Sequence, residues 1–171
     1  MSSSTENNSQ RPELQENLDL LQGLPHFATF PPRALKLLAF LAERATFTKG
    51  DVLFERGDDS GRAYLLLSGQ LDLLLNTREE DHRIDHFTDG EFLGGFSLLT
   101  AMPALFTLIA AQPSRVLCID RQQFSKILEQ FPETGKIFLQ ALLKELYQWE
   151  RRNCSREERL SPPYNLGATA L

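Results

Sequence analysis

The chain has 171 residues, 42% of them hydrophobic, and its formal net charge at pH 7 is −5. This length suits a single domain with its own hydrophobic core, and the negative charge argues against general attraction to nucleic acid or to anionic membranes. The two cysteines have no CxxC partner or histidine-rich neighbour, which argues against a disulfide framework and against a zinc site.

The N-terminal region predicts two helices. Residues 1–12 are polar, so we expect them to be disordered and do not read them as a secretory signal. Leucines at helical spacing then predict a short amphipathic helix that stops at Gly23. Pro31 and Pro32 suit the first turn of a second helix. We expect both helices to belong to one folded domain that spans residues 13–153.

Between about residues 45 and 120 the pattern changes to short strand-like runs separated by glycine, aspartate and asparagine. Residues 105–111 and 116–119 are almost continuously apolar and predict buried strands. Many short strands at even spacing are typical of a closed barrel or sandwich.

Helical periodicity returns at about residue 121 and continues to about residue 153. The second, longer helix of this region carries a broad apolar surface formed by Phe138, Leu139, Leu142, Leu143, Leu146 and Trp149. One face can cover the domain's own strands, and the other can pair with a second copy or pack internally. Residues 154–171 are charged and then proline-rich, so we expect a flexible tail.

A glycine-rich turn, Gly90-Glu91-Phe92-Leu93-Gly94-Gly95, precedes a short helical segment that contains Phe96 and Ser97. Such a turn can direct backbone amides at an anion, although the same pattern also occurs in purely structural turns.

The order of these elements resembles the cyclic nucleotide-binding domain family, as in Crp/Fnr-like effector domains. The residues that carry the resemblance are Leu24-Pro25-His26-Phe27, Gly50-Asp51-Val52-Leu53-Phe54, Gly57-Asp58, Tyr64, Leu66, Ser68-Gly69, Gly90-Glu91-Phe92-Leu93-Gly94, Pro103, Val116-Leu117-Cys118-Ile119-Asp120-Arg121 and Phe124. The resemblance implies a mainly β fold: a double-stranded, jelly-roll-like β-roll flanked by N-terminal helices and a long C-terminal helix. It also implies a non-enzymatic regulatory module in signal transduction.

The resemblance implies a phosphate-binding cassette formed by Gly90, Glu91, Phe92, Gly94, Gly95, Phe96, Ser97, Ala104 and Leu105. In the family, a glutamate binds the ribose 2′-hydroxyl, and an arginine and a hydroxyl residue hold the cyclic phosphate. Those three positions fall on Gly95, Ala104 and Leu105, so this cassette is degenerate.

The missing side chains predict weak binding of cyclic AMP or cyclic GMP. Losing the arginine removes about 2 to 5 kcal/mol of binding free energy, and losing the ribose hydrogen bonds about 1 to 3 more. At about 1.4 kcal/mol per decade, an assumed micromolar affinity becomes about millimolar or weaker. We expect the apolar replacements to close the pocket. The alternative is that it accepts a less polar anion.

Other ligands and partners find less support. His82 and His86 lie on one expected strand, about 13 Å apart along the chain, so they cannot share a metal ion. Too few residues follow the long helix for a helix-turn-helix, so no DNA binding is expected. No catalytic motif occurs, and no apolar run reaches the roughly 18 residues of a membrane helix.

Three functional hypotheses remain from the sequence. The first is a cytoplasmic regulatory domain that has weakened or lost nucleotide binding and acts through a homodimer or a protein partner. The second is a genuine cyclic nucleotide sensor that uses the backbone amides of residues 94–97. The third is a structural interaction module built on the long helix.

Overall fold

Eight short strands form two antiparallel sheets in the computed structural model, which describes residues 6–76 and 81–157. The first sheet has the strand order β1-β8-β3-β6 and the second β2-β7-β4-β5. The strands are β1 (Glu43–Phe47), β2 (Val52–Phe54), β3 (Arg62–Ser68), β4 (Leu71–Asn76), β5 (Asp81–Phe87), β6 (Phe92–Leu93), β7 (Thr107–Ala110) and β8 (Ser114–Asp120). The predicted β-roll is confirmed, and its observed limits lie close to the expected ones.

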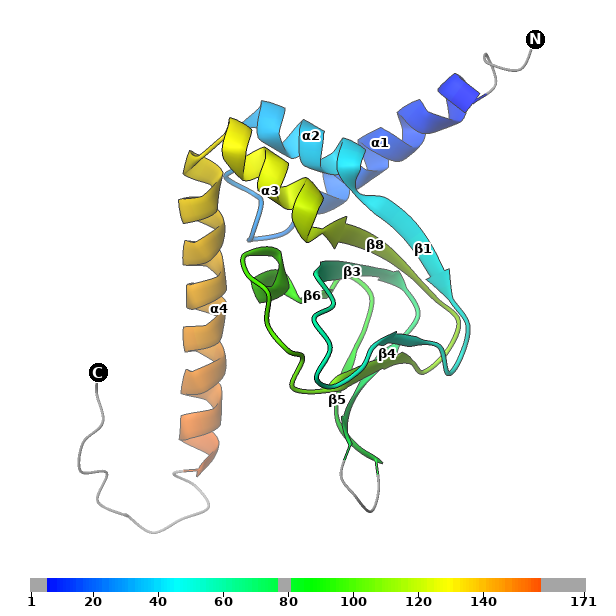
Figure 1. Cartoon of the computed structure of the whole chain (residues 1–171), viewed down its shortest axis with the longest axis vertical. Coiled ribbons are helices and arrows are strands. Elements are labelled where there is room, and N and C mark those ends of the chain that lie inside the picture. The colour runs from blue at the N-terminus through cyan, green and yellow to red at the C-terminus, as the bar shows by residue number, and fades with distance from the viewer. Residues whose placement is uncertain (1–5, 77–80, 158–171) are drawn as a thin grey trace.

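Helices flank the roll on two sides (Figure 1). They are α1 (Glu6–Gln22), α2 (Pro32–Leu41), the 3-10 helix η1 (Gly95–Leu98), α3 (Arg121–Gln130) and α4 (Glu133–Glu157). In Figure 1, α2 and α3 cross one end of the roll and α4 runs along its side.

Two helix ends differ from the sequence expectation. Helix α1 starts at Glu6, before the expected start, and α4 extends to Glu157, beyond residue 153. The chain around both ends is polar, so no apolar residue marks where the helix stops. The expected disorder of residues 1–5 and most of the expected tail, residues 158–171, lie outside the described residues.

Tight turns let the strands follow one another closely. Gly69 joins β3 to β4 with a φ of 115°, and a Cβ there would collide with Ser114. Only glycine meets both requirements at this position. The Ser114 hydroxyl bonds to the backbone N–H and carbonyl of Gln70 at 3.1 Å, which fixes the turn against β8.

The hydrophobic core has two parts. The part inside the roll is formed by Tyr64, Leu66, Leu71, Leu108, Ala110, Val116 and Cys118. Burial raises the pKa of the Cys118 thiol to about 11, so it stays protonated at neutral pH. The larger part lies where the helices meet the roll, and it contains the stacked rings of Phe27 and Phe138, 5.3 Å apart.

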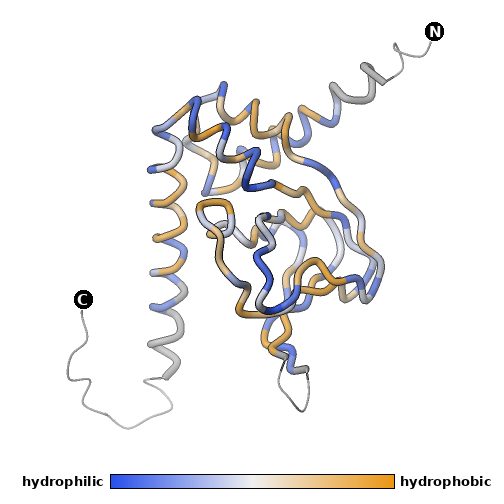
Figure 2. Tube along the Cα trace, in the orientation of Figure 1, coloured by the Kyte–Doolittle hydropathy of each residue, from blue (hydrophilic) through white to orange (hydrophobic). Residues whose placement is uncertain are grey.

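Hydrophobic residues recur turn by turn along α4 (Figure 2). Among the hydrophobic residues of α4 whose side chains the structure describes, Phe138 and Leu142 are almost completely buried, and both belong to the core between the helices and the roll. Helix α4 is therefore anchored to the domain by one stripe of its surface.

The expected buried strand at residues 105–111 is partly wrong. Strand β7 begins at Thr107, and Leu105 lies before it with 71% of its surface exposed. Leu105 and Phe106 line a cavity instead of entering the sheet, and hydrophobicity alone does not distinguish these two placements.

Candidate functional site

Within the cassette, the chain leaves β6 and turns sharply into η1. Gly94 makes this turn with a φ of 78°, and a Cβ there would lie 2.7 Å from the carbonyl oxygen of Arg62 in β3. Glycine is required here because the chain adopts a left-handed conformation while passing close to another strand. The turn places η1 against β3 and α3.

A cavity of about 550 Å³ lies at this position. Six of the predicted cassette residues line it: Gly94, Gly95, Phe96, Ser97, Ala104 and Leu105. The expectation that apolar replacements close the pocket is therefore wrong. Their side chains surround an open volume in place of filling it.

The lining of the cavity is mainly apolar and carries one negative charge. The other lining residues are Phe54, Asp58, Ser60, Leu73, Met102, Pro103 and Phe106. Among the described residues that line it, Asp58 is the only charged one. Ala104 occupies the position of the family's arginine, and its backbone N–H donates to the carbonyl oxygen of Asp58 at 2.8 Å. This hydrogen bond holds the loop that contains Asp58 against Ala104.

The first three cassette residues do not line this cavity. Gly90, Glu91 and Phe92 border a separate groove beside α4. A carboxylate oxygen of Glu91 accepts hydrogen bonds from the backbone N–H and hydroxyl of Thr88, at 2.5 and 3.1 Å. Glu91 therefore stabilises the turn before β6.

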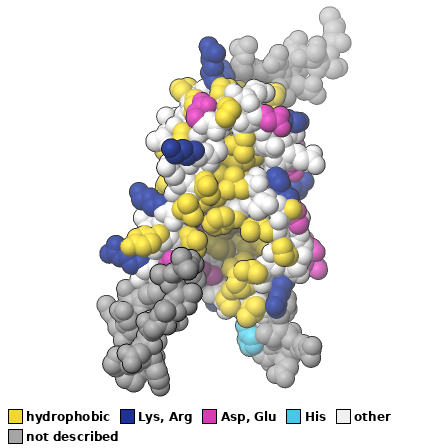
Figure 3. All heavy atoms as spheres, turned by 60° about the vertical axis from the view of Figure 1, so that its left-hand side comes forward, with side chains coloured by type: hydrophobic (Ala, Val, Ile, Leu, Met, Phe, Trp, Pro, Cys, Tyr) yellow, Lys and Arg dark blue, Asp and Glu magenta, His cyan; other side chains and the backbone are white. Residues whose placement is uncertain are grey.

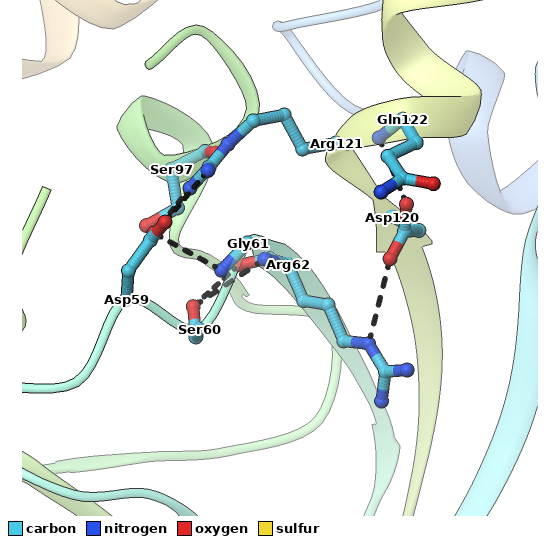
Figure 4. Close-up of polar contacts among 8 residues, drawn as sticks. All are labelled: Asp59, Ser60, Gly61, Arg62, Ser97, Asp120, Arg121 and Gln122. Carbon is cyan, nitrogen blue, oxygen red and sulfur yellow. Dashed lines mark hydrogen bonds and ion pairs between the residues drawn. The ribbon is translucent and has the colours of Figure 1, made fainter. Parts of the chain in front are cut away.

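Arg121 is not a cassette residue, but it contacts the cassette at Ser97, and the sequence did not indicate this contact (Figure 4). It starts α3, and its guanidinium binds both carboxylate oxygens of Asp59, while its Nε donates to the Ser97 carbonyl at 2.5 Å. The Asp59–Arg121 pair, called the clamp below, therefore joins three segments: the loop before β3, η1 and α3. The Ile-Asp-Arg run at the end of the last strand marks Arg121 in the sequence, but nothing local indicates its partner 62 residues away.

The clamp is an ion pair of the scaffold, not a replacement phosphate site. The hydrogen bonds from Arg121 lower the pKa of Asp59 to about 2, so the carboxylate stays charged at neutral pH. Gly61 N also donates to Asp59, at 3.3 Å. Arg121 is absent from the residues that line the cavity, so its charge faces Asp59 and the η1 backbone.

Gly95, at the expected ribose position, is packed against α4. A Cβ on Gly95 would lie 2.6 Å from Leu142 Cδ2 and 3.3 Å from a ring carbon of Phe92. Gly95 is also buried and lines the cavity. The backbone of η1 therefore has the cavity on one side and α4 on the other.

The groove beside α4 that Gly90, Glu91 and Phe92 border lies between α4 and the roll and has a volume of about 620 Å³. Figure 3 shows this side of the molecule, where hydrophobic side chains gather around a hollow. At its edge the Nε2 of His26 lies 2.8 Å from a carboxylate oxygen of Glu145 in α4. His26 Nδ1 is buried and has no hydrogen-bond partner in the part of the chain that the structure describes.

Five of the six apolar residues predicted for the dimer helix fall into two groups. Phe138 and Leu142 are buried against the domain, whereas Leu139, Leu143 and Leu146 are 43%, 50% and 40% exposed. The side chain of Trp149 lies outside the described residues. Among the residues that the structure describes, Leu139, Leu143 and Leu146 therefore form a partly exposed row on α4.

No metal cluster of three or more histidine, cysteine or acidic residues occurs in residues 6–76 and 81–157. His82 and His86 lie on β5 opposite Leu75 and Asp72 of β4. Among the described helices, none is both long and apolar enough to cross a membrane.

Comparisons with known proteins agree with this geometry. The family model described as "Cyclic nucleotide-binding domain" matches residues 44–131, half of the chain. A cyclic nucleotide-binding-like protein from Brucella abortus is 31% identical, with a TM-score of 0.62, and the match covers 67% of this chain and 98% of that one. The regulatory domain of protein kinase A from Toxoplasma gondii, solved with cAMP, has the same fold at 15% identity, with a TM-score of 0.69 and coverage of 82% and 52%.

The chain belongs to the cyclic nucleotide-binding domain family. Among curated proteins, it is 27% identical to the cAMP-dependent protein kinase regulatory subunit of Colletotrichum orbiculare over 64% of its own length. That match spans 28% of the kinase subunit, so the chain aligns with less than a third of that relative's length.

Proposed function

We propose that this chain is a cytoplasmic regulatory module whose cassette does not hold cyclic AMP or cyclic GMP tightly. The observation that carries the proposal is the cavity itself, which has Ala104 and Leu105 at the phosphate positions and Asp58 as its only charge among the described lining residues. The cavity lacks the arginine that would attract a cyclic phosphate. The Asp58 carboxylate repels the phosphate because both carry negative charge. We expect a dissociation constant of about 1 mM or weaker.

The module has a route for output through α4. Gly95 touches the cavity on one side, and Leu142 packs against it on the other. A ligand that enters the cavity and moves η1 would disturb the packing of α4 against Gly95. We propose that α4 passes this change to a second copy or to another protein through Leu139, Leu143 and Leu146, which are exposed.

Isothermal titration calorimetry tests the binding claim. The wild-type chain and the Ala104→Arg variant are titrated with each nucleotide, and Ala104→Gln is the control for side-chain size. We expect the arginine to tighten binding at least about 10-fold and the glutamine to change it by less than about 3-fold, because only the arginine adds charge-assisted hydrogen bonds to phosphate.

Two results would count against the proposal. Micromolar binding by the wild-type chain would favour a second candidate, a genuine nucleotide sensor, for which the open cavity leaves room. An arginine at position 104 that gives no gain would show that this position does not face the phosphate.

A further inference from the structure

The cassette cavity leaves large apolar side chains in contact with solvent. Phe96 and Met102 are each 39% exposed and Leu105 is 71% exposed, and all three line the cavity. Phe54, Leu73 and Phe106 line it as well. Apolar surface that converges on one concave site is typical of a ligand pocket and unfavourable to leave in water.

The polar groups of the cavity are few, and two of them have partners within the protein. The Ser97 carbonyl accepts a hydrogen bond from Arg121, and the Ser60 hydroxyl donates to the Arg62 carbonyl at 3.3 Å. No arginine, lysine or histidine occurs among the described residues that line the cavity, and Asp58 adds a negative charge. An anion entering here would lose hydration without gaining a cation.

We propose that the cassette cavity binds an uncharged, predominantly apolar small molecule. The volume of about 550 Å³ lies within the range of pockets that hold compact organic ligands. Such a ligand would cover Phe96, Met102 and Leu105 and would leave Asp58 in water at the rim. This inference rests on the proposed function, because it names the ligand class of the same regulatory site.

Fluorescence titration with Nile red, an uncharged apolar dye, tests the ligand class. Met102→Glu and Leu105→Glu place a charge in the cavity at exposed positions, so both variants should still fold, which a cooperative thermal melt confirms. Phe40→Glu, at an α2 side chain that is 71% exposed and does not line the cavity, and Ala141→Glu in the groove beside α4 are matched controls. We expect saturable binding that weakens at least about 10-fold in the two cavity variants and less than about 2-fold in the controls.

Three outcomes would overturn the inference: no saturable binding of Nile red, equal loss in the control variants, or tighter binding of the anionic dye ANS than of Nile red in the same cavity. None of them depends on the nucleotide titration. Micromolar binding of cyclic AMP or cyclic GMP would instead overturn the proposed function. The two failures are therefore distinguishable.

Discussion

At the scale of single residues, Gly95 links the cassette to α4. Its backbone lines the cavity, and the space where a side chain would begin is occupied by Leu142. A glutamate at this position, as the family pattern requires, would need α4 to move. We propose that this one residue accounts both for a missing ribose contact and for the close packing of α4.

We predict that Gly95→Ala destabilises the domain by about 1 to 2 kcal/mol, because the added Cβ overpacks the contact with Leu142. Urea unfolding measures this change in the wild-type background and in Leu142→Ala. In the second background the truncated side chain leaves room, so the alanine at position 95 should have little or no destabilising effect. An equal loss in both backgrounds would show that α4 does not pack on Gly95 in solution.

At the scale of elements, the Asp59–Arg121 clamp holds the loop before β3, η1 and α3 together. The ordinary pKa of Asp59 is 3.8 and its folded-state pKa is about 2, so the folded state favours the charged carboxylate. The stability that this pair contributes is therefore fully present above about pH 4 and lost as the pH falls towards 2.

We expect the free energy of unfolding of Asp59→Asn to fall less between pH 5 and pH 2 than that of the wild type, because the variant has no carboxylate to protonate. Urea titrations across this pH range measure the difference. Asp58→Asn is the matched control, since Arg121 pairs with Asp59 and not with the neighbouring Asp58. If Asp59→Asn and the wild type lose stability in parallel, the clamp does not form in solution.

Elements could be predicted from the sequence where a local pattern specifies them. The period of apolar residues located the roll and the long helix. The cassette positions, including Gly94, Gly95 and Ala104, came from the resemblance to the family's motif and not from a local pattern. Contacts between distant segments could not be predicted in this way. Arg121 reaches Asp59 across 62 residues, and Leu105 lines an open cavity although its hydrophobicity predicts burial.

At the scale of the whole molecule, α4 presents leucines that the described part of the domain covers only in part. Phe138 and Leu142 are unsuitable for testing an interface, because they are buried and changing them would destabilise the packing of α4 against the domain. Leu139→Glu and Leu143→Glu leave that packing intact. If α4 pairs two copies, sedimentation velocity should show a dimer for the wild type and a monomer for these variants, with Gln140→Glu as the control. A monomeric wild type would contradict pairing of two copies.

We propose that the cavity lies where the family binds its nucleotide but binds cyclic AMP and cyclic GMP only weakly. The most direct measurement is the melting temperature with and without about 1 mM cyclic AMP or cyclic GMP. A millimolar dissociation constant predicts a rise of only about 1 to 2 °C. A ligand present at 100 times its dissociation constant would add about 2.7 kcal/mol and raise the midpoint by about 5 to 10 °C. A rise of that size with either nucleotide would contradict the account.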